Sequence, residues 1–180
     1  MNLHRSRILL SVIAVVALLL GLVAAMHRYT TSTSDAATAA LFEQTFSDAD
    51  GRPRPMKQWQ GRLLVLNFWA TWCAPCVEEM PELQKVQQDY AERGVAVVGL
   101  GIDNAAAIRR FRDEQGIALP LLVAGAGGSE VARQFGNASG ALPYTVLIDR
   151  DGRIVQARLG RIREQELRDW LDARVGRSPG

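Results

Sequence analysis

The 180-residue sequence has few of the side chains from which metal centres are built. It contains two cysteines and two histidines, and both His4 and His27 fall within its first 30 residues. A closed structural zinc site usually takes four cysteine or histidine ligands, which excludes one within a single chain. Two thiolates can hold copper(I), a soft ion, so that alternative stays open. Apart from it, we expect no metal and no organic cofactor.

A surplus of basic charge is also missing. The formal net charge is +2, but Arg5, Arg7 and Arg28 lie in the first 30 residues, which contain no acid. The remaining residues hold 18 of the 21 basic side chains and all 19 acidic ones, a net charge of −1. Proteins that bind nucleic acids carry clustered positive charge that neutralises phosphates. A nearly neutral body excludes that class, and we expect no nucleic-acid partner.

Charged residues are absent from Ile8 to Met26. An α-helix of this length would extend over roughly 28 Å, close to the thickness of the hydrocarbon core of a bilayer. Arg5 and Arg7 precede the run, and positive charge at that end favours an N-terminus on the cytoplasmic side. The sequence therefore predicts one transmembrane segment within residues 1–29.

Two interpretations of this apolar segment compete. Val23-Ala24-Ala25 offers small residues at which a signal peptide could be cleaved. The apolar core of a signal peptide usually has about 7–15 residues, so the longer run here favours an uncleaved membrane anchor. Under either interpretation the rest of the chain is exported from the cytoplasm.

The rest of the chain divides into a short polar segment and one domain. Residues 30–40 are small and polar, which predicts a linker, and residues 41–177 are predicted to form the domain. Apolar runs predict strands at 63–69, 95–102, 121–123, 144–148 and 153–159. Helical spacing predicts helices within 73–93, after a cap at Asp103 or Asn104, at 129–135 and at 167–175. This order predicts an α/β fold in which helices cover both faces of a mixed sheet.

Both cysteines lie in the segment Trp72-Cys73-Ala74-Pro75-Cys76, which follows a predicted strand and opens a predicted helix. A cysteine at a helix N-terminus faces unpaired backbone N–H groups, which favour its thiolate form. We therefore predict that Cys73 is the attacking thiol and that Cys76, one turn further, resolves the mixed disulfide. Trp72 is expected to flank the pair as an apolar contact surface.

A static disulfide is the alternative interpretation of this pair. Structural disulfides more often join distant segments, and one that closes so small a ring removes little chain entropy. The spacing of Cys73 and Cys76 therefore favours a redox disulfide that opens and closes in exchange with other proteins.

Three segments resemble thioredoxin-like proteins: Asn67–Cys76 (NFWATWCAPC), Glu79–Leu83 (EMPEL) and Leu142–Asp149 (LPYTVLID). The strongest likeness is to the membrane-anchored TlpA/ResA-like thiol-disulfide oxidoreductases of bacteria, and it extends from about Phe42 to Val175. The resemblance implies a thioredoxin fold with an N-terminal extension and a central insertion within residues 103–128.

The resemblance also implies a site residue far from the cysteines in sequence. Pro143 is expected to form a cis peptide bond and to pack beside the dithiol. The backbone of Leu142 is then expected to pair with an incoming peptide. The alternative for Pro143 is an ordinary proline at a strand edge.

Two residues depart from the pattern of cytosolic thioredoxins. Asn67 takes the place of a buried aspartate, and an amide cannot accept a proton from the resolving thiol. Glu79 lies three residues after Cys76, so the two share a helix face. In ResA-like relatives a glutamate at this place influences the titration of the dithiol, which makes Glu79 a candidate proton acceptor for Cys76. The alternative is a solvated helix glutamate, and Glu78, on another face, is the internal control.

The sequence thus predicts a disulfide reductase in the bacterial inner membrane, with one transmembrane pass and its catalytic domain in the periplasm. The resemblance implies disulfide-bearing protein substrates, a transmembrane thiol donor, and clients in cytochrome c maturation or oxidase copper-site assembly. A disulfide oxidase or isomerase is one alternative, because the Ala74-Pro75 pair does not determine the reduction potential. A copper(I)-delivery module is the other.

Overall fold

The computed structural model describes the backbone of residues 3–176 and the side chains of residues 12–23 and 35–176. It separates into two units, residues 1–34 and 35–180. Helix α1 (Leu3–Phe42) begins in the first unit and ends in the second. Across the residues whose side chains are described, none of the helices combines the length and the apolarity that crossing a membrane requires. Most of the predicted transmembrane segment, 1–29, lies outside those residues.

A seven-stranded mixed sheet organises the second unit, with the strand order β2-β1-β5-β4-β3-β6-β7. The strands are β1 (Thr45–Asp48), β2 (Pro53–Pro55), β3 (Leu63–Trp69), β4 (Val95–Gly101), β5 (Leu121–Val123), β6 (Tyr144–Ile148) and β7 (Ile154–Leu159). Strands β3, β4 and β5 run parallel to one another, and the remaining pairs are antiparallel. The central strands β3 and β4 are buried along their whole length, in agreement with their continuous apolar sequence.

The helices that accompany these strands lie close to their predicted positions, although α5 begins at Glu164, before the predicted start at Leu167. They are α2 (Ala74–Tyr90), α3 (Ala105–Gln115), α4 (Gly128–Gln134) and α5 (Glu164–Val175), with 3-10 turns at η1 (Met56–Trp59), η2 (Ala91–Arg93) and η3 (Gly125–Gly127). Asn104 caps α3 by accepting a hydrogen bond from the backbone nitrogen of Ala107 at 2.9 Å. Gly116 ends that helix at a φ of 63°, a conformation that favours glycine.

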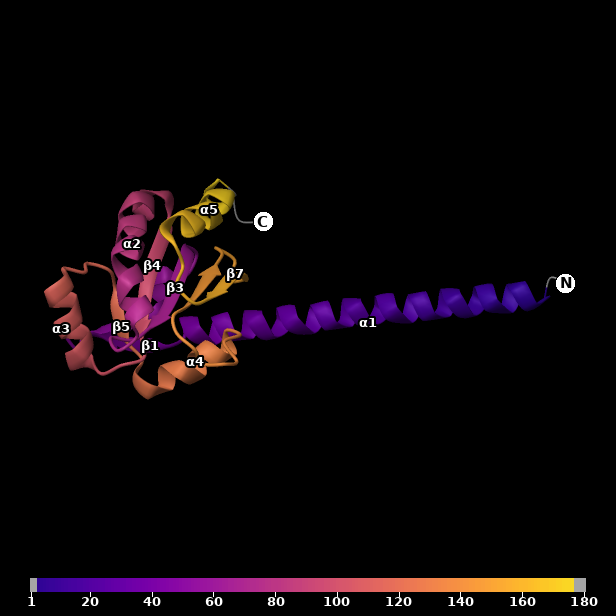
Figure 1. The fold of residues 1–180 in the computed structure, drawn as a ribbon, viewed down its shortest axis with the longest axis horizontal. Helices are drawn as coiled ribbons and strands as arrows, with labels where there is room; N and C mark the ends of the chain where they lie inside the picture. Colours follow the sequence, from indigo (N-terminus) through magenta and orange to yellow (C-terminus); the bar gives the residue numbers. More distant parts are fainter. Residues whose placement is uncertain (1–2, 177–180) are drawn as a thin grey trace. The chain divides into compact units, whose positions relative to one another are not determined.

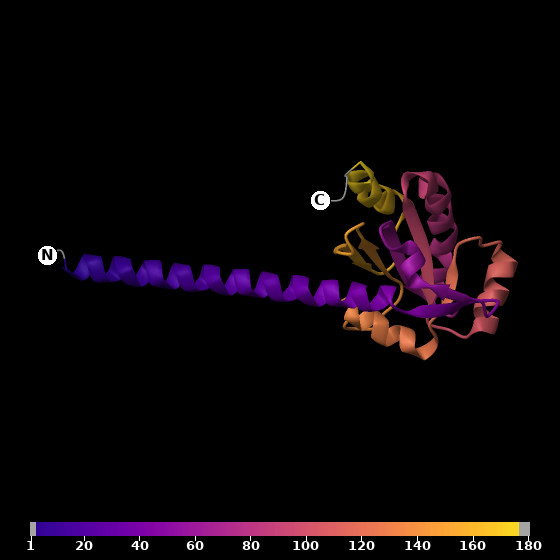
Figure 2. The ribbon, with the colours of Figure 1, turned by 180° about the vertical axis from the view of Figure 1, so that it is seen from behind.

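Helices cover both faces of the sheet, as the α/β prediction requires (Figures 1 and 2). We call the two sides the dithiol face and the aromatic face. The dithiol face packs against α2, α3 and α5 and contains Cys76. The aromatic face packs against α4, η1 and the end of α1 and contains Phe68. Residues of β3 alternate between the two faces, because successive side chains of a strand point in opposite directions.

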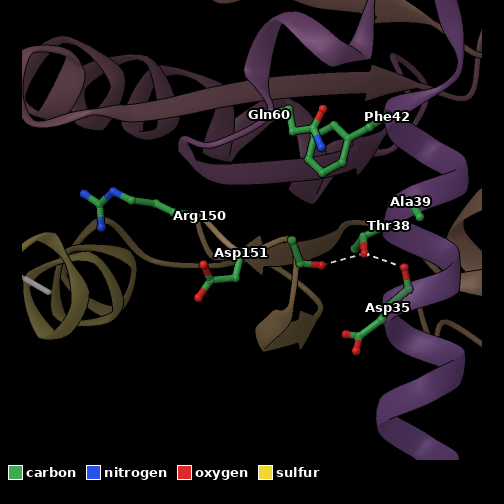
Figure 3. Close-up of a pocket in the computed structure, with 8 residues that line it drawn as sticks. Asp35, Thr38, Ala39, Phe42, Gln60, Arg150 and Asp151 are labelled. Carbon is green, nitrogen blue, oxygen red and sulfur yellow. Dashed lines mark hydrogen bonds between the residues drawn. The ribbon is translucent and has the colours of Figure 1, made fainter. Parts of the chain in front are cut away.

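The last turns of α1 belong to the domain rather than to a linker. Thr38 is buried, and its hydroxyl lies within hydrogen-bonding distance of the carbonyl oxygens of Asp35 and Gly152, between which its single hydrogen is shared (Figure 3). A cavity of about 140 Å³ adjoins this contact. Leu41 and Phe42 are also buried in the aromatic face. The compact unit therefore starts at Asp35, before the predicted boundary between linker and domain at residues 40 and 41, because the small residues of this segment pack closely against the turn between β6 and β7.

Candidate active site

The two cysteines lie at the N-terminus of α2 and form a disulfide, with a Cα–Cα distance of 5.2 Å. Cys73 is the N-cap residue, in an extended conformation, and Pro75 occupies the first turn of the helix. The carbonyl oxygen of Cys73 accepts hydrogen bonds from the backbone nitrogens of Cys76 and Val77, at 3.0 and 3.1 Å. Cys73 is 7% exposed and Cys76 is fully buried. The first cysteine is therefore the one that a partner protein can reach.

The loop that leads into α2 is held by Asp103. The Oδ2 atom of Asp103 accepts hydrogen bonds from both the backbone nitrogen and the hydroxyl of Thr71. The backbone nitrogen of Ile102 donates to the carbonyl oxygen of Trp69 at 2.8 Å. Between these fixed residues and Cys73, the side chain of Trp72 is 70% exposed. A large exposed indole beside the dithiol supplies an apolar surface for contact with another protein.

The Leu142–Pro143 peptide bond is cis. Pro143 is buried, and its carbonyl oxygen accepts a hydrogen bond from the backbone nitrogen of Gly160 at 2.8 Å. Leu142 is partly buried and packs against residues of both faces of the sheet. These contacts fix the start of β6 against the loop between β7 and α5.

Glu79 is completely buried on the dithiol face of the sheet. Its Oε1 atom accepts a hydrogen bond from Asn67 Nδ2 at 2.7 Å, and its Oε2 atom accepts one from the backbone nitrogen of Ile162 at 2.9 Å. Burial raises the pKa of Glu79 from 4.5 to about 7, against the lowering effects of these two donors and of Arg161. A carboxyl group with a pKa near neutrality can both accept and release a proton under physiological conditions.

Arg161 joins the start of α5 to the helix that bears the dithiol. Its guanidinium donates to Glu78 at 2.8 Å and to Glu82 at 2.6 Å. Glu82 also accepts a hydrogen bond from the backbone nitrogen of Glu164 at 2.7 Å. Three glutamates of α2, Glu78, Glu79 and Glu82, are thus bound to the segment that leads into α5. Only Glu79 is buried, whereas the Glu78 side chain is 60% exposed.

The chain matches the Redoxin family over residues 33–171. It belongs to that family. The ResA thiol-disulfide oxidoreductase of Bacillus thuringiensis (strain Al Hakam) is 32% identical over 126 residues, which cover 69% of this chain and 70% of the relative. The ResA protein of Halalkalibacterium halodurans is 29% identical over 168 residues, or 91% of each chain.

A solved structure leads to the same conclusion. The thiol:disulfide interchange protein of the thioredoxin family from Chlorobium tepidum TLS superposes with a TM-score of 0.64 and 26% identity, over 74% of this chain and 93% of the other. This Redoxin-family protein thus has a thioredoxin-like fold of the ResA/TlpA type and is a thiol-disulfide oxidoreductase.

The Redoxin-family site brings together residues that the sequence placed there and others that it did not. Cys73, Cys76 and Glu79 share the dithiol face. Three further residues were not identified from the sequence, because they act through contacts between distant segments: Asp103, Arg161 and Thr145, whose hydroxyl accepts a hydrogen bond from Asn67 Nδ2 at 2.9 Å. Of these, Thr145 is the one that the sequence could have indicated, because a polar residue in a short apolar strand has to find a partner. Among the described residues, no group of three or more His, Cys, Asp or Glu side chains could hold a metal ion.

Proposed function

We infer that this protein is a disulfide reductase that acts on other proteins through Cys73 and Cys76. The thiolate of Cys73 attacks the disulfide of a client, and one client sulfur leaves as a thiolate. Cys76 then attacks the Cys73 sulfur of the mixed disulfide, which releases the second client thiol and leaves the Cys73–Cys76 disulfide. The observation that carries this proposal is the position of Cys73 at the accessible N-terminus of α2, with Cys76 buried one turn behind it.

Glu79 is the proposed proton acceptor for Cys76. The two residues are three positions apart on α2 and are both completely buried, so they lie on one helix face away from solvent. Water cannot easily remove the proton of a buried thiol, and a carboxylate with a pKa of about 7 is suited to accept it. Pro143 and Leu142 are proposed to contact the client peptide, together with Trp72.

We place the protein in the bacterial inner membrane, with the domain on the periplasmic side. The uncharged run from Ile8 to Met26 supports this proposal. Where its side chains are described, at residues 12–23, all the large apolar ones are between 49% and 73% exposed. An exposed apolar surface of this kind favours burial in lipid. The resemblance to TlpA/ResA-like proteins supports a transmembrane thiol donor, and clients in cytochrome c maturation or oxidase copper-site assembly.

A trapping experiment tests the proposal. Replacing the resolving residue, Cys76→Ser, leaves Cys73 able to attack but leaves the mixed disulfide unresolved. Membranes that contain the full-length variant should yield covalent complexes with clients and with the electron donor, which are separable by non-reducing electrophoresis. The double variant Cys73→Ser with Cys76→Ser is the matched control and should yield none. Recovery of no complex from the single variant would count against the proposal.

The direction of electron flow is tested by the reduction potential of the dithiol. For a two-electron couple, about 30 mV corresponds to roughly 1.4 kcal/mol, so the potential separates the two directions clearly. A reductase is expected to have a potential near that of thioredoxin, about −270 mV. A value near about −120 mV, typical of a strong periplasmic oxidant, would show that the protein acts as an oxidase instead.

A further inference from the structure

The carboxylate of Glu79 is held by one hydrogen-bond donor on each of its oxygens. One donor is the side-chain amide of Asn67, and the other is the backbone nitrogen of Ile162. Both donors stabilise the ionised carboxylate, which burial alone would strongly disfavour. The backbone donor would be present whatever the side chain at position 162, but the amide donor exists only because residue 67 is an asparagine. That residue therefore influences how readily Glu79 takes up a proton.

Thr145 anchors the Asn67 amide beside Glu79. The two residues face each other across the antiparallel pair of β3 and β6, and both are completely buried. Asn67 Nδ2 donates its second hydrogen bond to Thr145 Oγ1 at 2.9 Å, so both amide hydrogens are used. The ionised carboxylate only accepts hydrogen bonds, so it keeps the nitrogen of the amide, rather than its oxygen, toward Glu79. The threonine hydroxyl holds the amide in that place.

The carbonyl oxygen of the same amide has no partner. Asn67 Oδ1 is buried and accepts no hydrogen bond from any residue that the structure describes. If the amide turned over, Oδ1 would face the carboxyl group of Glu79. Two acceptors would then oppose each other, unless the carboxyl carried a proton that it could donate. The observed direction of the amide is therefore matched to an ionised Glu79, and the reversed direction is matched to a protonated one.

We propose that Asn67 and Thr145 are positioning residues for proton transfer at the dithiol. Thr145 holds the amide in place, and the amide keeps Glu79 in the ionised form that accepts the proton of Cys76. The transfer converts the Cys76 thiol into a thiolate and Glu79 into a neutral acid. The amide then turns over, and Asn67 Oδ1 accepts the new O–H of Glu79. This inference rests on the proposed function, because it assigns the proton acceptor of the resolving thiol.

Other charged groups around Glu79 stay the same when Asn67 or Thr145 is replaced. Arg161, in the loop before α5, lowers the pKa of Glu79, and Glu82, one turn along α2, raises it. In the reduced protein the thiols of Cys73 and Cys76 titrate as well. Measurements on the oxidised protein exclude the thiols, because disulfide-bonded cysteines do not titrate. A change in the titration of Glu79 then reports on the replaced residue.

The test follows the side-chain carboxyl carbon of Glu79 by NMR across pH 4–10, in the full-length oxidised protein labelled with carbon-13 glutamate. We expect Asn67→Leu to raise the midpoint by about one pH unit, because a buried carboxylate loses a donor. Thr145→Val should raise the midpoint by a smaller amount, whereas Thr145→Ser keeps the hydroxyl and should leave the midpoint close to that of the unsubstituted protein. Thr38→Val removes a buried hydroxyl elsewhere in the domain and should leave the midpoint unchanged.

A second measurement separates positioning from a purely structural role. For the same variants, a mixed disulfide between Cys73 and a small peptide is prepared, and the rate at which Cys76 releases the peptide is measured against pH. The pH midpoint of this rate profile should move upward together with the pH midpoint of Glu79. The shift should be largest in Asn67→Leu, smaller in Thr145→Val and smallest in Thr145→Ser. Equal midpoints for the valine and serine variants, with no movement in Asn67→Leu, would overturn the proposal. If Cys76→Ser traps no client although the midpoints move, the proposed function fails and the positioning of Glu79 stands.

Discussion

The two faces of the sheet differ in the polar side chains that the described strands bury. The aromatic face brings together the rings of Phe68, Phe135 and Tyr144, with centroid separations of 6.1 Å from Phe68 to each of the others. The dithiol face buries Asn67, Glu79 and Thr145 in addition to its apolar residues. The same strands supply both faces, because their residues alternate. Both faces stabilise the fold by apolar packing, but only the dithiol face also carries the free-energy cost of buried polar residues on its strands, next to the cysteines.

The largest expected effect is the loss of all exchange activity in Cys73→Ser. The change removes the only thiol among the described residues that a partner can reach. A serine hydroxyl stays protonated near neutral pH and does not attack disulfides. Turnover of a peptide disulfide by the full-length variant should fall to the uncatalysed rate. The same assay on Phe68→Leu is the control from the aromatic face and should retain activity per folded molecule. Residual catalysis in Cys73→Ser would mean that Cys76 can attack from its buried position.

The aromatic face should respond in stability rather than in chemistry. Phe68 is fully buried, and Phe68→Ala should lower the free energy of unfolding by about 3–5 kcal/mol, since it removes a ring and leaves a cavity. Urea unfolding of the oxidised protein measures this loss. Phe68→Leu keeps most of the volume, so it should lose less and give a folded variant for comparison. A loss below about 1 kcal/mol in Phe68→Ala would contradict the assigned role of this face.

The buried carboxyl of the dithiol face should make stability depend on pH. The pKa of Glu79 rises from 4.5 in the unfolded chain to about 7 in the folded protein, so the folded state binds more protons between these values. The contribution of this group to the free energy of unfolding should therefore fall as pH rises from about 4.5 to 7, by at most about 3 kcal/mol. Unfolding of the oxidised protein at several pH values measures the slope.

Two substitutions isolate this slope. The glutamine of Glu79→Gln cannot ionise, so the free energy of unfolding of this variant should not show the decline between pH 4.5 and 7. This holds whatever the absolute stability of the variant. Glu78→Gln alters an exposed neighbour with the same charge and should keep the decline. In the reduced protein, only Glu79→Gln is expected to change the titration of the thiols. Identical curves for the two variants would remove Glu79 from the mechanism.

The difference between the faces also explains what could be predicted from the sequence. Strands such as 63–69 and 144–148 match their predictions because continuous apolar runs leave few other structures for buried segments. The buried polar network was not predictable in the same way. Asn67 and Glu79 were identified through the family resemblance, but their link to Thr145 and Ile162 joins residues that are far apart in sequence. The start of the domain at Asp35 was missed because small residues such as Ala37 have no strong hydrophobic pattern, although they pack closely.

The smallest expected change in stability belongs to Trp72, which lies on neither face. Its side chain is 70% exposed, so Trp72→Ala should alter the free energy of unfolding by no more than about 0.5 kcal/mol. Its neighbours stay in place, because Thr71 is bound to Asp103 and the carbonyl oxygen of Cys73 accepts hydrogen bonds from the first turn of α2. If the indole serves as a contact surface for clients, exchange with a protein disulfide should slow while exchange with a small uncharged disulfide stays constant. Equal slowing with both substrates would indicate that Trp72 affects the dithiol itself, and that recognition and chemistry are not separated at this site.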